Sequence, residues 1–346
     1  MTEGNRDRKI AASTVDEMIP VSSPDGHWLH PLFSRRVIFV LGKGGAGKTT
    51  AAIALGMAAR RMNKRLLVVE TGDSDAVGNL CLSRTLSEIP EEILPALWGA
   101  RINPKSELEA YIRAHVGSGF ISRKIIRSRL FSYLMDATPG LKEVMSLGRI
   151  WRWEQEKTQQ AQNRFDLIIV DAPATGHAMS LLRLPAQLVR MIRVGPVANQ
   201  IRDIERLLKN PEKTCLAVVT LPEELPVNEA MEMYAMAEDE LEMPVAVTFI
   251  NCVYPSIFTK SEAGQIDFLK GRFNEHPDSP NVAMLDAALR IIHRRDMQQK
   301  YIDRIAARAP GKVAEIPFYF TNDLTFEDID TLSQALFPSS FISNRV

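Results

Sequence analysis

The clearest pattern along the chain is a series of short runs of consecutive apolar residues. The runs lack the polar alternation of a half-exposed strand, which is typical of strands covered on both faces. They predict strands at Val37–Leu41, Arg65–Glu70, Asp166–Val170, Thr214–Thr220, Val245–Ile250 and Val313–Phe318. Apolar residues with helical spacing lie between them, at Thr49–Asn63, Leu141–Trp153, Leu181–Leu208, Ala283–Ala307 and Phe326–Phe337. This alternation predicts an α/β fold with a doubly wound, mainly parallel sheet.

The same pattern suggests how the chain is divided. Residues 1–34 are polar and contain several prolines, which predicts a flexible N-terminal tail, and residues 35–346 form one large domain. Between Ala76 and Phe165 the pattern is helical and shows no strand, over a length far beyond a simple crossover of about 30 residues. We therefore expect an inserted α-helical subdomain built from about residues 76–165 and 180–210.

Part of this insertion has an amphipathic pattern with basic residues on its polar side. The apolar positions are Ile121, Ile125, Ile126, Leu130, Tyr133 and Leu134. Such a stripe is either a core face beneath a solvated one or a surface that meets a membrane or a partner segment. The pattern alone leaves both interpretations open.

A glycine-rich loop lies between the first predicted strand and the first predicted helix. Its spacing, G-x-x-x-x-G-K-[ST], is that of a phosphate-binding loop, in which backbone N–H groups turn inward around phosphate oxygens. Lys48 can reach the β- and γ-phosphates, and the Thr49 hydroxyl can bind Mg²⁺. The predicted nucleotide-binding residues of the loop are Gly42, Lys43, Gly44, Gly45, Ala46, Gly47, Lys48, Thr49 and Thr50.

The loop also fits a second pattern. Gly42, Gly44 and Gly47 spell G-x-G-x-x-G, and Glu70 ends the next strand, as in a dinucleotide site. A pyrophosphate-binding turn of that kind does not need a lysine and a hydroxyl at positions 48 and 49. The sequence therefore favours a nucleoside triphosphate with Mg²⁺ as the ligand.

Acidic residues follow two of the predicted strands, at the edge where ligands bind in such sheets. Glu70, Asp73 and Asp75 follow the second strand, and any of them could orient an attacking water or hold the water shell of a metal. A turn with a helix cap is the alternative explanation. Asp171 ends the strand at 166–170 and suits Mg²⁺. Gly176 lies in the loop after it and could present its backbone N–H to a γ-phosphate.

Composition and charge limit the class of protein. The chain has 346 residues and a formal net charge of zero, so no charge excess points to nucleic acid. No apolar run reaches the ~18 residues of a membrane span, and no secretory signal pattern is present. Cys81, Cys215 and Cys252 are isolated, which favours buried thiols in a reducing, cytoplasmic compartment.

Two motifs together resemble a known group of proteins. The deviant phosphate loop of a large group of ATPases is similar to residues 43–50, K-G-G-A-G-K-T-T. One branch of that group contains the arsenite-pump and tail-anchored-protein targeting ATPases. The second switch of this branch is similar to residues 171–185, D-A-P-A-T-G-H-A-M-S-L-L-R-L-P. The resemblance covers about residues 36–336. It implies that Lys43 crosses a dimer interface to the partner's nucleotide, that Asn251 hydrogen-bonds adenine, and that Pro317 and Phe318 pack around the base.

The resemblance also implies partners and an output. A single phosphate loop implies that the facing site comes from a second chain, in a homodimer or in a hetero-pair with a related ATPase. The branch handles hydrophobic segments or membrane proteins, so a client of that kind is expected. The first switch, residues 70–75 with the sequence E-T-G-D-S-D, departs from the family pattern D-P-A-H. Asp73 is the residue expected to position the water, with Glu70 and Asp75 as competitors. The catalytic set is therefore Lys43, Lys48 and Asp73, and the metal ligands are Thr49 and Asp171.

Alternative functions stay open at this point. The departure in the first switch also fits a slow or non-catalytic regulatory subunit of a hetero-pair. The ATPase subunit of an anion pump is a further alternative, although the cysteine triad of the arsenite pumps has no counterpart here. The dimer-clamping C-x-x-C of the family is absent, so no zinc is expected.

Overall fold

Eight strands form one sheet, in the order β3-β4-β2-β5-β1-β6-β7-β8. The computed structural model describes residues 29–72, 75–115, 126, 140–191, 195–273, 280–321 and 323–338. Every neighbouring pair of strands is parallel except β3 and β4. The strands are β1 (Val37–Gly42), β2 (Leu66–Glu70), β3 (Glu91–Leu94), β4 (Leu97–Arg101), β5 (Leu167–Asp171), β6 (Thr214–Thr220), β7 (Val245–Val253) and β8 (Lys312–Pro317). The predicted doubly wound, mainly parallel α/β fold is confirmed.

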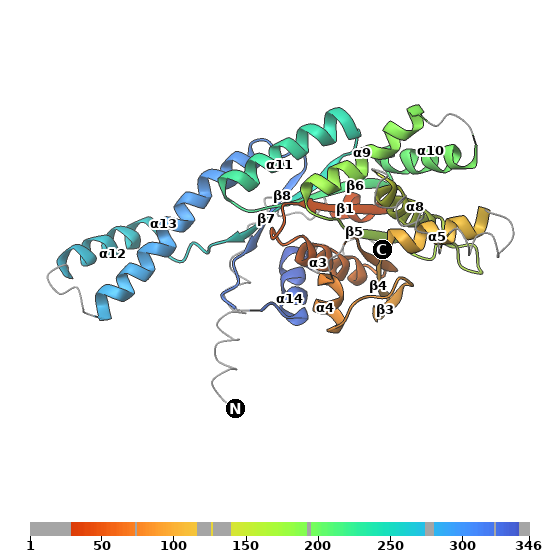
Figure 1. Cartoon of the computed structure of the whole chain (residues 1–346). Helices are drawn as coiled ribbons and strands as arrows, with labels where there is room; N and C mark the ends of the chain where they lie inside the picture. The colour runs from red at the N-terminus through yellow and green to blue at the C-terminus, as the bar shows by residue number, and fades with distance from the viewer. Residues whose placement is uncertain are drawn as a thin grey trace.

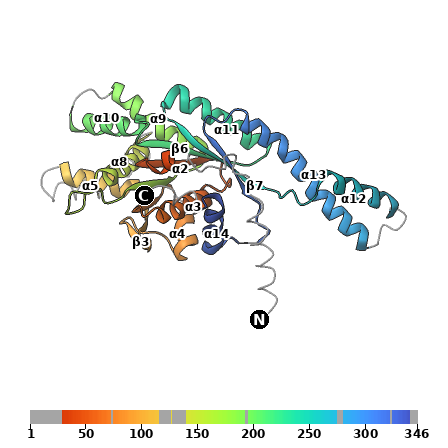
Figure 2. The ribbon, with the colours of Figure 1, turned by 180° about the vertical axis from the view of Figure 1, so that it is seen from behind.

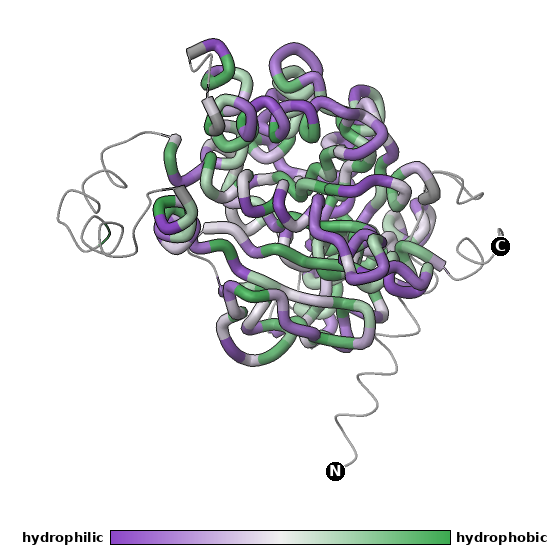
Figure 3. The backbone as a smooth tube through the Cα atoms, turned by 90° about the vertical axis from the view of Figure 1, so that its right-hand side faces the viewer, coloured by the Kyte–Doolittle hydropathy of each residue, from purple (hydrophilic) through white to green (hydrophobic). Residues whose placement is uncertain are grey.

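Helices cover both faces of this sheet (Figures 1 and 2). One face carries α2 (Leu29–Phe33), α3 (Lys48–Arg61), α4 (Ala76–Leu82) and α14 (Phe326–Leu336). The other carries α8 (Leu141–Gln155), α9 (Thr175–Met191), α10 (Pro196–Lys209), α11 (Glu224–Met236) and a π-helical turn, η1 (Ala237–Leu241), while α5 (Pro104–His115) packs on α8. Every residue of β1, β2, β5 and β6 is buried. The hydrophobic positions gather in these central strands (Figure 3), which explains the unbroken apolar runs.

The expectation that no strand lies between Ala76 and Phe165 is wrong. β3 and β4 form an antiparallel hairpin that extends the sheet beyond β2. Both strands are short and β3 is only partly buried, so neither gives a long apolar run. Gly99 in β4 resembles a turn residue in the sequence, but a Cβ there would lie 2.7 Å from the Ile93 side chain. The glycine therefore allows the hairpin to close.

The amphipathic stripe of the insertion falls largely outside the part of the chain that the structure describes. This applies to Ile121, Ile125, Leu130, Tyr133 and Leu134. Of the neighbouring elements, α5 packs on α8, and α8, α9 and α10 pack on one another.

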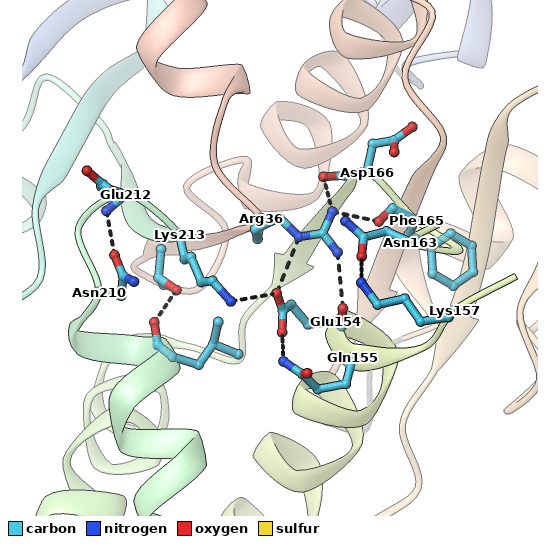
Figure 4. A network of polar contacts seen from close by, with 12 residues as sticks. Arg36, Glu154, Gln155, Lys157, Asn163, Phe165, Asp166, Asn210, Glu212 and Lys213 are labelled. Atoms are coloured by element: carbon cyan, nitrogen blue, oxygen red, sulfur yellow. Dashed lines mark hydrogen bonds and ion pairs between the residues drawn. The ribbon is translucent and has the colours of Figure 1, made fainter. Parts of the chain in front are cut away.

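The amino ends of the central strands are held by a network of buried charges (Figure 4). Arg36 precedes β1, and its guanidinium donates to the carbonyl oxygens of Phe165, Asp166 and Glu154 at 2.7–3.0 Å. It also lies 3.3 Å from the carboxylate of Glu154, which is 4% exposed and which Lys213 Nζ contacts at 3.3 Å. This network ties β1, β5 and β6 to α8 at the edge opposite the phosphate-binding loop.

Two helices extend away from the body as an arm (Figure 1). They are α12 (Lys260–Phe273), which has no buried residue, and α13 (Pro280–Ala306). The carboxyl half of α13 packs on the body through Ile302 and Ile305, next to β7 and α11. None of the described helices combines the length and the apolar character needed to cross a membrane.

Candidate active site

The phosphate-binding loop connects the end of β1 to the start of α3. Gly42 ends the strand with a φ of 155°, and a Cβ there would lie 2.1 Å from the Val219 carbonyl oxygen of β6. Gly47 is the N-cap of α3 with a φ of 94°, and its Cβ would lie 2.1 Å from Asn251 Nδ2. Only glycine therefore fits either position, so the spacing of the loop reflects how tightly it is packed between β6 and β7.

The rest of the loop and the first turn of α3 carry positive charge and no acidic residue. Gly44, Gly45 and Ala46 lie within the loop, and Lys48, Thr49 and Thr50 form the first turn of α3 with no acidic residue among them. Lys48 Nζ donates to the Lys43 carbonyl oxygen at 3.3 Å. Burial lowers the pKa of Lys48, and the charge of Asp171 opposes this shift. The helix dipole and the half-buried ammonium make the loop a site for an anion such as a polyphosphate.

Two buried carboxylates end the strands beside this loop. Asp171 at the end of β5 is 5% exposed, and its Oδ2 accepts a hydrogen bond from Thr49 Oγ1 at 2.6 Å. Glu70 at the end of β2 is 1% exposed, and its Oε1 accepts from the backbone N–H of Val77 at 3.0 Å. Burial raises the pKa of both carboxyl groups, and their mutual repulsion adds to the shift for Glu70. Asp171 Oδ1 and Glu70 Oε2 have no hydrogen-bond partner within the described part of the chain.

This arrangement fits Mg²⁺. The ion prefers hard oxygen ligands and few protein groups, since phosphate and water fill the rest of its octahedron. Thr49 offers a hydroxyl, and Asp171 offers a buried carboxylate oxygen that no group in the described residues uses. Both predicted metal ligands therefore meet in one place, from α3 and β5.

The two switch segments lie near the loop. Asp73 lies outside the described residues, whereas Asp75 precedes α4 and pairs with Arg101 of β4 at 3.1 Å. Gly176 was expected in a loop, but it lies in the first turn of α9. Its segment begins beside the phosphate-binding loop, because a Cβ on Gly44 would lie 3.9 Å from the Ala174 side chain. The start of α9 therefore lies next to the phosphate-binding loop.

Lys43 contacts its own chain. Its Nζ lies 3.3 Å from Glu229 Oε1 of α11, and both side chains are about one-third exposed, at 38% and 34%. No sequence pattern singles out Glu229, which is one of several acidic residues on that helix. The pair fixes the resting position of the lysine that the family resemblance directs to a partner.

The residues expected at the base lie at the ends of β7 and β8. Asn251 Nδ2 donates to the Ala46 carbonyl oxygen at 2.9 Å, and its Oδ1 accepts from Cys252 N at 2.8 Å. Pro317 ends β8, and Phe318 stacks on Tyr254 with ring centroids 4.7 Å apart. In this structure the amide of Asn251 is engaged by the phosphate-binding loop itself.

Tyr254 was missed by sequence reasoning. It follows β7 as Phe318 follows β8, and Arg294 of α13 lies over its ring at 5.1 Å. The signal was available, since parallel neighbours bring the residues after their carboxyl ends together. An aromatic pair therefore lies at the expected base end of the site.

Fold and loop together define the chain as a P-loop nucleotide hydrolase. The family model described as anion-transporting ATPase matches residues 35–204 of the chain. The resemblance found in the two motifs is confirmed, and the chain is an ATP hydrolase.

Individual relatives agree with this assignment. The chain is 27% identical over 264 residues to the ATPase BagA of Mycobacterium tuberculosis, which covers 72% of this chain and 77% of that protein. It is 25% identical over 320 residues to the ATPase GET3 of Kluyveromyces lactis, which covers 82% and 83%. An ATPase ASNA1 homolog of Paramecium tetraurelia is 29% identical over 150 residues, 43% of each chain.

Proposed function

We propose that this ATPase is a Mg²⁺-dependent switch that works in a pair, with a second copy or a related ATPase, and handles a hydrophobic protein segment or a membrane protein. The observation that carries the Mg²⁺ and ATP part is the meeting of Thr49, Asp171 and the phosphate-binding loop, with a buried carboxylate oxygen left over. The pairing and the client rest on the family and on the relatives named above.

Each group has a role in this proposal. Lys48 and the N–H groups of residues 42–50 bind the phosphates, while Thr49 and Asp171 hold Mg²⁺. When bound, the ion neutralises charge that develops on the phosphate oxygens. Asp73 orients the attacking water, and the backbone N–H of Gly176 contacts the γ-phosphate. Asn251, Pro317 and Phe318 surround the base.

Lys43 is the group that would couple two chains. It reaches the partner's nucleotide in the proposal, so it must first leave Glu229 of its own chain. An ion pair with both side chains this exposed contributes about 0–1 kcal/mol. A phosphate group across an interface can therefore outcompete Glu229.

The cysteines argue against a metalloid site of the arsenite-pump type. The three thiols are free and lie on α4, β6 and β7. Burial raises the pKa of Cys81 and of Cys215 to about 12, so neither is a ready thiolate. Free thiols also support a reducing, cytoplasmic location for the activity.

The test is nucleotide-dependent pairing and turnover. Purified chain with ADP and aluminium fluoride should form a pair in sedimentation experiments, and with Mg²⁺ and ATP it should release phosphate. Lys48→Ala should abolish ATP affinity, and Lys105→Ala, an exposed position of α5, should not. The proposal fails if the wild type binds neither ATP nor ADP, or if Lys48→Ala binds as well as wild type. Binding without turnover would instead support the regulatory subunit.

A further inference from the structure

The second oxygen of Glu70 has no assigned role. The residue is 1% exposed, and its Oε1 already caps the first turn of α4 through the N–H of Val77. Its Oε2 has no hydrogen-bond partner within the described residues. A buried carboxylate oxygen without a partner costs stability, so a structural cap alone does not explain a glutamate here.

The position of Glu70 in the sheet places it beside the metal ligands. Glu70 of β2 pairs in register with Asp171 of β5. Alternate residues show which face they share: Val68 and Ile169, two positions earlier, both lie in the core cluster beneath α3. Side chains two apart in a strand share a face, so Glu70 and Asp171 both point toward the N-terminal turn of α3. Thr49 lies in that turn and binds Asp171.

The other described acid of the first switch is already occupied. Asp75 pairs with Arg101 at 3.1 Å and is about one-third exposed. Glu70 and Asp171 pair in register on neighbouring strands, each keeps a buried oxygen without a partner in the described part of the chain, and Asp171 also binds the Thr49 hydroxyl. Two such oxygens on one face attract a cation with its hydration shell.

We propose that Glu70 is a positioning residue of the Mg²⁺ site, whose Oε2 accepts a hydrogen bond from a water of the ion's shell beside Asp171. This inference rests on the proposed function, since it assumes that Thr49 and Asp171 hold Mg²⁺. It separates two roles in the first switch: Glu70 orients the metal's water, and Asp73 orients the attacking water.

The test measures metal affinity directly. Mn²⁺ replaces Mg²⁺, and its binding to the chain saturated with ADP is followed by electron paramagnetic resonance. Glu70→Gln keeps an oxygen for the Val77 N–H but loses the charged acceptor. We expect Mn²⁺ affinity to fall about 10- to 100-fold, as for other outer-shell partners, with metal-free ADP affinity unchanged. Asp75→Asn is the matched control and should bind Mn²⁺ like the wild type.

The outcomes separate this inference from the proposed function. If Glu70→Gln binds Mn²⁺ as tightly as wild type, Glu70 is only the cap of α4 and the inference is wrong. If the wild type does not bind ADP at all, the proposed function fails first. Glu70→Met, of similar length, provides a second variant if the glutamine variant does not fold, and it should show the same loss of Mn²⁺ affinity.

Discussion

Charged residues lie at both ends of the central strands, and the two ends compensate these charges differently. At the amino ends, Arg36 contacts three carbonyl oxygens and Glu154, and Arg65 holds Asp166 through bonds of 2.9 and 3.1 Å. At the carboxyl ends, Glu70 and Asp171 each keep one oxygen without a partner within the described residues.

This difference indicates a separate role for the amino ends and for the carboxyl ends of the strands. Buried charges with complete partners hold the elements of a fold together, and removing one partner is strongly destabilising. Buried charged groups that lack hydrogen-bond partners destabilise the ligand-free protein, and a bound ligand can supply the missing partners. The amino edge is therefore a structural anchor, and the carboxyl edge is prepared for a cation and phosphates.

The largest effect should come from breaking the anchor. Arg36→Met leaves the buried Glu154 carboxylate with Lys213 as its remaining ion-pair partner and leaves three carbonyl oxygens without their donor. We expect a loss of about 3–5 kcal/mol in the free energy of unfolding, measured with urea. Exposed Arg308→Met should change little, and ATP affinity of folded Arg36→Met should equal that of wild type. Equal losses in the two variants would contradict the anchor.

The second prediction is that a substitution at the carboxyl ends of the strands raises the free energy of unfolding instead of lowering it. Asp171→Asn keeps an oxygen for Thr49 but removes a buried charge whose desolvation outweighs its attraction to Lys48, so the nucleotide-free chain should gain about 1 kcal/mol or more of stability. Turnover should fall about 100-fold as the metal is lost. Asp166→Asn at the amino edge is the control, and it should lose stability and keep turnover. A destabilised Asp171→Asn chain would show that the carboxylate has a hidden partner.

The two edges should also respond to pH in opposite directions. Burial raises the pKa of Glu70 and Asp171, so the folded chain binds more protons than the unfolded chain above pH ~4, and their contribution to stability falls as pH rises through the folded values. At Asp166, burial raises the pKa of the carboxyl group, but the hydrogen bonds from Arg65 outweigh burial and the pKa is lowered. The contribution of Asp166 to the stability of the fold is therefore present at neutral pH and is lost on acidification.

Urea unfolding of nucleotide-free chains at pH 5 and pH 8 separates these contributions. The stability gain of Glu70→Gln with Asp171→Asn should be larger at pH 8 than at pH 5. The stability loss of Asp166→Asn should shrink only as the pH falls toward the lowered pKa of Asp166. A double variant whose gain does not grow with pH would contradict the raised pKa values.

A smaller effect concerns the contact between β7 and the loop. Asn251→Ala removes the bond to the Ala46 carbonyl oxygen and the one from Cys252 N. We expect a cost of about 1 kcal/mol, hence an ATP affinity about fivefold weaker by calorimetry. Exposed Asn199→Ala on α10 should have no effect. An unchanged affinity in Asn251→Ala would show that the loop holds its shape without β7.

The smallest effect concerns Lys43. Glu229→Gln frees the lysine from a pair worth less than about 1 kcal/mol, so pairing with ADP and aluminium fluoride should tighten by fivefold or less. Glu232→Gln, on the same helix and exposed, is the matched control. Weaker pairing in Glu229→Gln would mean that Glu229 itself belongs to the interface.

The sequence predicted those parts of the fold and site that depend on local pattern. The central strands appear as apolar runs because helices cover both faces, and β6 has the predicted bounds. The hairpin β3–β4 was missed because short, partly buried strands give no such run. Gly176 was misplaced because a proline and a glycine close together are typical of a loop. Here Pro173 precedes α9, and Gly176 lies in its first turn.

The remaining parts of the site depend on contacts between distant elements. Spacing placed Lys48 and Thr49 on the loop, and strand ends indicated Asp171. Neither feature reveals that Glu229 of α11 meets Lys43, or that Oε2 of Glu70 finds no partner among the residues that the structure describes. Those facts follow from how α11 and α4 pack, which no local pattern records.

The arm formed by α12 and α13 has a mechanical consequence. The side chain of Gln298 in α13 bonds the backbone of Cys252 and Tyr254 at 2.9 and 2.8 Å, directly after Asn251. From Gln298 to Pro280 the helix extends about 27 Å. If α13 tilted by about 10° at Gln298, Pro280 at its other end would move by about 5 Å. A small movement next to the expected nucleotide-base site would therefore become a larger movement at the end of the arm.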